Sequence, residues 1–111
     1  MTVSARKTPA PRAVVLALSP PLRSLLRQLI DGVLPGAQVA VFGSRATGHA
    51  RPFSDLGLLF IAPPRLTWAQ RADLRDALEA SALPFSVDVV ELAGLAAGMR
   101  QRVWAEAQPL P

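Results

Sequence analysis

The chain has 111 residues, a formal net charge of +4 and no cysteine. This length suits one domain with a modest core and excludes a separate substrate-binding domain, while the lack of cysteine excludes disulfides and thiolate metal sites. No apolar run approaches the roughly 20 residues of a membrane span, so we expect a cytoplasmic protein with no membrane association.

Part of the positive charge lies at the start of the chain. Arg6, Lys7 and Arg12 belong to a Pro-rich stretch, residues 1–12, which we expect to be a flexible leader before a single domain over residues 13–111. The other arginines are scattered and aromatic residues are few, so stacking platforms for bases are not evident. We therefore do not expect nucleic acid as the direct substrate.

The first predicted helix begins after Ser19, because serine can cap a helix and the prolines that follow suit its first turn. Apolar residues then recur at helical spacing: Leu22, Leu25, Leu26, Leu29, Ile30 and Val33. Pro35-Gly36 ends this helix. A short apolar strand is predicted next, over residues 37–42.

That strand stops at Gly43 and Ser44, which together have the character of a phosphate-binding loop. Glycine lets backbone approach a ligand closely, and a short helix beginning near Ser44 would direct free N–H groups toward an anion. Arg45 adds positive charge. The pair could instead form an ordinary turn, and Arg45 could equally pair with Asp55.

Asp55 opens the next predicted strand, residues 55–61, which is almost entirely apolar after its first residue. Such a strand is expected at the centre of a sheet that is covered on both faces. A carboxylate at its mouth can hold a divalent metal against phosphates bound by the preceding loop. Asp55 could also be a simple residue at the start of a strand.

Two helices and one strand are predicted in the remainder of the chain. Thr67 and Gln70 have the spacing of a capping box, which begins a helix that runs to about residue 82. A strand over residues 85–91 follows, in which Asp88 lies between valines; a carboxylate in an apolar strand is costly unless it is paired, hydrogen-bonded or metal-bound. A weaker helix is predicted over residues 96–106.

The spacing from Gly43 to Asp55 resembles the motif of the minimal nucleotidyltransferase domain of the DNA polymerase β-like superfamily, which reads G-S, roughly ten residues, then D-x-D. Asp88 matches the third carboxylate, which the family places on a later strand. The resemblance covers about residues 18–92. It implies an α/β fold in which helices pack on a small mixed β-sheet.

The resemblance also implies a reaction, the transfer of AMP from ATP to a hydroxyl group with Mg²⁺ as cofactor. Family members of this size commonly act as antitoxins that add AMP to a tyrosine of a HEPN-type toxin, so a helical HEPN-type partner is implied. Asp55 and Asp88 would be the catalytic metal ligands. The nucleotide-binding positions would be Gly43, Ser44 and Arg45.

The chain departs from the motif at Gly57, where the family has the second aspartate. Side chains two apart on a strand point to the same face, so the two aspartates of the family motif together form one metal-binding site. This chain has the first of them, Asp55, and lacks the second. Three accounts stay open. The chain is a weak enzyme in which Glu91 or water fills the gap, a non-catalytic module that neutralises a partner by direct contact, or a variant engineered at this position to trap a complex.

Apolar residues make up 50% of this small domain, and two of them are tryptophans. Such a composition predicts apolar surface left over for another chain. Trp68 and Trp104 are predicted to be anchors in the core or at an interface. We therefore expect a homo- or hetero-oligomer.

Overall fold

The computed structural model describes residues 15–111, so the leader expected over residues 1–12 lies outside the described residues. The elements follow in the order α1 (Pro20–Val33), β1 (Gln38–Phe42), α2 (Ser44–Thr47), β2 (Leu56–Ala62), α3 (Trp68–Glu79), β3 (Val87–Glu91), the 3-10 helix η1 (Leu92–Gly94), α4 (Ala97–Glu106) and β4 (Gln108–Leu110). No helix within this part of the chain is long and apolar enough to cross a membrane.

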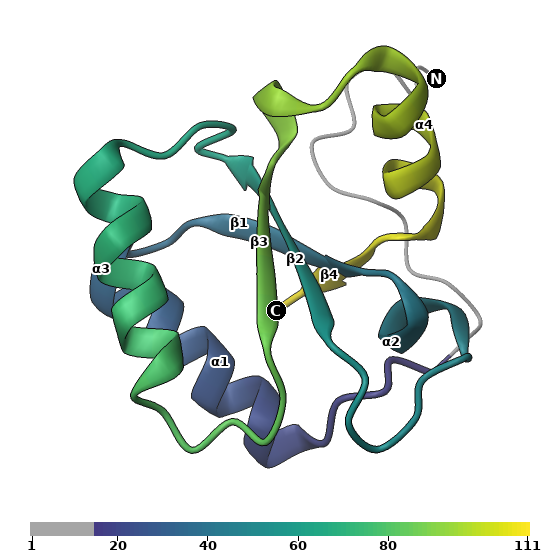
Figure 1. Ribbon diagram of the computed structural model, residues 1–111, viewed down its shortest axis with the longest axis horizontal. Helices are drawn as coiled ribbons and strands as arrows, with labels where there is room; N and C mark the ends of the chain where they lie inside the picture. The colour runs from purple at the N-terminus through teal and green to yellow at the C-terminus, as the bar shows by residue number, and fades with distance from the viewer. Residues whose placement is uncertain (1–14) are drawn as a thin grey trace.

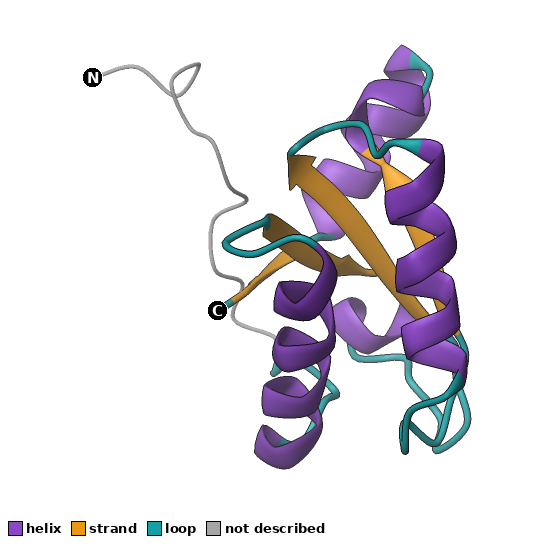
Figure 2. Ribbon diagram, turned by 90° about the vertical axis from the view of Figure 1, so that its left-hand side faces the viewer, coloured by secondary structure: helices purple, strands orange, loops and turns teal. Residues whose placement is uncertain are grey.

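The strands form one mixed sheet in the order β3-β2-β1-β4 (Figure 1). β2 and β3 are parallel, whereas β1 is antiparallel to both β2 and β4. Helices α1 and α3 pack on one face and α4 packs on the other (Figure 2). The predicted α/β fold with a small mixed sheet is therefore confirmed.

The central strand β2 is apolar along nearly its whole length because both of its faces are covered by helices. Its residues alternate between the two faces of the sheet. Leu56, Leu58 and Phe60 join the core under α1 and α3, whereas Leu59 and Ile61 pack with Val103 of α4. Gly57 has the same parity as Leu59, so it lies on the α4 face.

The structure corrects three details of the sequence analysis. The sequence does not predict β4, because a segment of three residues that includes a proline is too short to show the alternation of a strand. β4 pairs with β1 at the edge of the sheet, where proline is tolerated. α3 ends at Glu79 rather than near residue 82. Trp68 is 89% exposed, so of its two predicted positions the core is excluded and the interface stays a prediction, whereas Trp104 packs against the cluster under α4.

The capping box at the start of α3 is present as predicted. The Thr67 hydroxyl accepts a hydrogen bond from the Gln70 N–H at 3.1 Å, and Gln70 Oε1 accepts one from the Thr67 N–H at 2.9 Å. We predict that Thr67→Ala lowers the free energy of unfolding by about 1 kcal/mol, measured by urea denaturation. Thr67→Ser keeps a hydroxyl and should stay close to the parent; an equal loss in both variants would show that the cap is not the cause.

Candidate active site

The two predicted carboxylates meet at one end of the sheet. In the parallel pairing of β2 with β3, Asp88 lies beside Gly57, and Asp55 comes two residues before Gly57. All three line a shallow pocket of about 380 Å³, whose other lining residues are Phe42, Gly43, Ser86 and Val87. The structure thus brings Asp55, Asp88 and Gly43 together around the position where the motif is broken, whereas Ser44 does not line this pocket.

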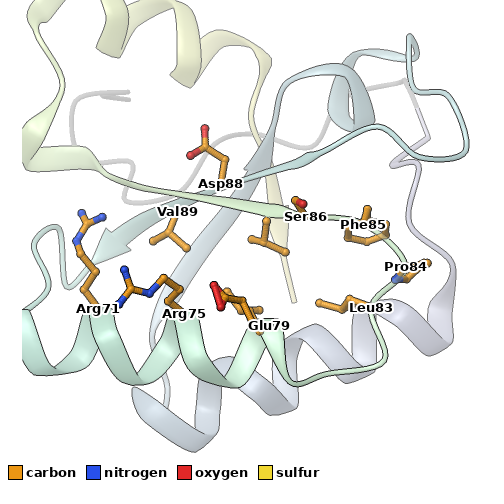
Figure 3. A pocket seen from close by; sticks show the side chains of 11 residues that line it. Arg71, Arg75, Glu79, Leu83, Pro84, Phe85, Ser86, Asp88 and Val89 are labelled. Atoms are coloured by element: carbon orange, nitrogen blue, oxygen red, sulfur yellow. The ribbon is translucent and has the colours of Figure 1, made fainter.

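Both carboxylates are exposed. Asp88 therefore needs no partner to offset burial of its charge, because β3 is an edge strand of the described sheet. Its valine neighbours Val87 and Val89 pack toward the core under α3, while the Asp88 carboxylate points away from α3 (Figure 3). Within residues 15–111 neither Asp55 nor Asp88 makes a side-chain hydrogen bond or ion pair, so both are available to a ligand.

Phe42 occupies the place where the second aspartate of the motif would be. It pairs with Gly57 across β1 and β2, and its ring lies on the glycine. A Cβ atom added at Gly57 would be 2.7 Å from Phe42 Cζ, which is closer than real carbon atoms approach. Sequence reasoning missed Phe42, because its position opposite residue 57 follows only from the strand register.

The Gly-Ser loop is held in place by a second residue that sequence reasoning missed. Gly43 has φ of 84°, a conformation that favours glycine. Its N–H donates to Glu106 Oε1 of α4 at 3.0 Å, and its carbonyl accepts a hydrogen bond from the Ala46 N–H at 2.9 Å. Ser44 follows at the start of the four-residue α2 and is half-buried. Its hydroxyl makes no hydrogen bond within the described residues, which leaves it available to a phosphate.

Arg45 is a buried residue that binds the backbone of neighbouring loops. It is only 7% exposed, and its guanidinium donates to the carbonyls of Ser54 at 2.9 Å, Ala17 at 2.9 Å and Pro52 at 3.3 Å. Burial lowers its pKa from the ordinary value, an effect that the Asp55 charge opposes. Three of its five N–H donors are used within the protein, and Arg45 does not line the pocket, so its contact with phosphate stays a prediction.

Phe85 covers the buried Arg45 from the other side. The Arg45 guanidinium carbon lies 4.1 Å from the centre of the Phe85 ring, a cation–π contact. No ion pair forms between Arg45 and Asp55 among the described residues, although that pairing was the alternative prediction. Arg45 therefore fixes the loop that leads into Asp55, while the Asp55 carboxylate itself stays exposed.

Glu91 does not fill the gap left by Gly57. It lies three residues after Asp88 and therefore on the opposite face of β3. Its carboxylate accepts hydrogen bonds from the Leu66 N–H at 2.5 Å and from Arg71, so it is engaged at the far end of the strand. The version of the weak-enzyme hypothesis that uses Glu91 is wrong.

The donor set decides which metal arrangement the site fits. Among residues 15–111 no group of three or more histidine, cysteine, aspartate or glutamate side chains is placed to hold a metal. Mg²⁺ is usually bound by one or two carboxylates together with substrate phosphates and water. Asp55 and Asp88 therefore fit one Mg²⁺ that arrives with a nucleotide, but they do not complete the platform for two ions.

A larger groove of about 650 Å³ runs between α3 and β3 beside the pocket (Figure 3). It shares Ser86, Val87 and Asp88 with the smaller pocket. The α3 side of the groove carries both signs of charge, on Arg75 and Glu79. The Asp88 carboxylate turns away from α3 and so away from this groove.

The contact between Phe42 and Gly57 can be tested by a double-mutant cycle. We predict that Gly57→Ala lowers the free energy of unfolding by about 1–3 kcal/mol, because the new methyl group displaces the ring. In Phe42→Ala the space is open, so adding Gly57→Ala to that variant should cost much less. Urea denaturation of the four proteins measures this coupling. Additive losses would mean that the ring does not occupy the space above residue 57.

Comparisons with known proteins agree with the fold. The family described as "Polymerase beta, Nucleotidyltransferase" matches residues 37–110. The chain is also similar to a protein of Haemophilus influenzae named probable protein adenylyltransferase MntA, with 31% identity over 78 residues, 70% of this chain and 68% of the relative.

Two solved structures share the fold. A toxin–antitoxin structure with AMP-PNP has a TM-score of 0.66 and 27% identity, over 80% of this chain and 72% of the other. A structure described as a minimal nucleotidyltransferase has a TM-score of 0.57 and 42% identity, over 79% of this chain and 95% of the other. The chain therefore belongs to the polymerase β nucleotidyltransferase family.

Proposed function

We propose that this protein is an antitoxin-type nucleotidyltransferase that transfers AMP from ATP to a hydroxyl group of a partner toxin, a tyrosine of a HEPN-type protein. The observation that carries this proposal is the placing of Asp55 and Asp88 on either side of Gly57, in one pocket with Gly43. The similarity to MntA supports AMP transfer to a protein. The similarity to a toxin–antitoxin structure with AMP-PNP supports the nucleotide and the kind of partner.

The chemistry follows from the two exposed carboxylates and the Gly-Ser loop. Asp55 and Asp88 would hold Mg²⁺ carried on ATP; this ion, when bound, offsets the phosphate charge and lowers the pKa of the attacking hydroxyl. The Ser44 hydroxyl and the backbone N–H groups at the start of α2 that stay free hold the terminal phosphates; the Gly43 N–H is already bound to Glu106. The acceptor oxygen bonds to the α-phosphorus, the bond from that phosphorus to the bridging oxygen breaks, and pyrophosphate leaves. The acceptor proton passes to the exposed Asp88 carboxylate.

A specific observation favours a second candidate function. The Phe42 ring occupies the space of the second aspartate, so the site is apolar where the family has a metal ligand. Loss of such a ligand weakens the metal site on which the chemistry depends. In this second function the chain neutralises its partner by covering it and transfers nothing.

Nucleotide binding tests the metal role of Asp55. We predict that the parent binds ATP weakly and only with Mg²⁺, because the phosphates and the exposed carboxylates repel each other without a cation between them. Asp55→Asn keeps the shape of the side chain, removes its charge and should abolish this binding in titration calorimetry. His49→Ala is the control, since His49 is exposed in the same loop and outside the pocket. Equal affinity in parent and Asp55→Asn would remove the metal role.

The reaction itself separates the two candidate functions. The parent is incubated with ATP, Mg²⁺ and a purified HEPN-type toxin, and the toxin is examined by mass spectrometry. We predict that AMP is added to a tyrosine and that Asp88→Asn abolishes the addition. A stable complex in which the toxin stays unmodified would favour the binding module.

A further inference from the structure

The turn that leads into Asp55 exposes one large apolar side chain. Phe53 is 81% exposed and lies two residues before Asp55. A single exposed apolar residue is common on protein surfaces and carries no meaning by itself. What distinguishes Phe53 is how firmly the protein holds the chain on both sides of it.

The carbonyls on either side of Phe53 are bound to the same buried side chain. Arg45 donates to Pro52 O at 3.3 Å and to Ser54 O at 2.9 Å. The turn is also closed on itself, since the Ser54 N–H donates to Arg51 O at 3.0 Å and the Arg51 N–H donates to the Ser54 hydroxyl oxygen at 2.8 Å. Phe53 is therefore displayed on a fixed backbone, and fixing an anchor before binding reduces the entropy lost in the complex.

The charge beside Phe53 indicates the kind of surface that fits it. Arg51 is exposed, and its guanidinium makes no hydrogen bond or ion pair with any residue that the structure describes. A few aromatic and arginine side chains commonly provide most of the binding energy of a protein interface. The matching surface has an apolar pocket for the ring and acidic side chains at its rim.

Position links this turn to the reaction. Two residues of extended chain span at most about 7 Å, so a protein that holds Phe53 lies against the pocket formed by Asp55 and Asp88. We propose that Phe53, with Arg51 beside it, anchors the acceptor protein through an apolar pocket with an acidic rim on that protein. This inference rests on the proposed function, because it assigns the surface on which the AMP acceptor docks.

The experiment compares Phe53→Ser with Trp68→Ser. Both side chains are exposed aromatics. Trp68 lies at the start of α3, after the end of β2 that is remote from Asp55, so Trp68→Ser controls for the loss of an exposed aromatic side chain away from the site. Titration calorimetry measures the affinity of each full chain for a purified HEPN-type toxin, and a second titration with ATP and Mg²⁺ checks that the pocket is intact. We expect Phe53→Ser to weaken toxin binding by about tenfold or more, and Trp68→Ser to leave it within about twofold, with nucleotide affinity unchanged in both.

Each outcome bears on the inference. Toxin affinity that is unchanged in Phe53→Ser, or equally weakened in Trp68→Ser, would overturn the inference while the proposed function stands. Light scattering that shows a parent dimer and a Phe53→Ser monomer, with toxin binding unchanged, would assign the turn to self-association and also overturn it. If the parent itself does not bind the toxin, the proposed function fails and the anchor fails with it.

Discussion

The contact between the Phe42 ring and the backbone of Gly57 governs what this site can do. Gly57 lies on the central strand, on the face that carries the site, directly beside Asp88. A side chain at this position would share the pocket with Asp55 and Asp88, but the ring already fills that space. A side chain at position 57 would therefore require the Phe42 ring to move.

The pocket depends on contacts between distant parts of the chain. Glu106 at the end of α4 binds the Gly43 N–H, and the side chain of Gln108 in β4 donates to Ala46 O at 2.8 Å. The last helix and strand therefore hold the Gly-Ser loop and α2 in position. Arg45 in turn holds the next loop, which leads into Asp55. In this small domain the C-terminal helix and strand thus supply the hydrogen bonds that hold the loop beside the pocket.

The sequence predicted what depends on local pattern and missed what depends on register. The capping box of α3, the apolar central strand and the positions of Asp55 and Asp88 could all be read from spacing. The ring above Gly57 could not, because it requires knowing which residues pair across β1 and β2. The exposure of Asp88 was missed because valine neighbours suit an edge strand as well as a central one. The burial of Arg45 was missed because a charged residue at the start of a short helix is usually exposed.

The central claim is that the metal platform is interrupted by one ring and one missing carboxylate, and a variant that reverses both tests it most directly. The melting temperature of Phe42→Ala/Gly57→Asp is compared with that of Phe42→Ala, in chelator and in Mg²⁺. The account predicts a lower melting temperature for the double variant in chelator, since three carboxylates then repel one another. It also predicts a larger gain from Mg²⁺, since an ion that binds only the folded state stabilises it. If Mg²⁺ shifts both proteins equally, position 57 does not border a metal site.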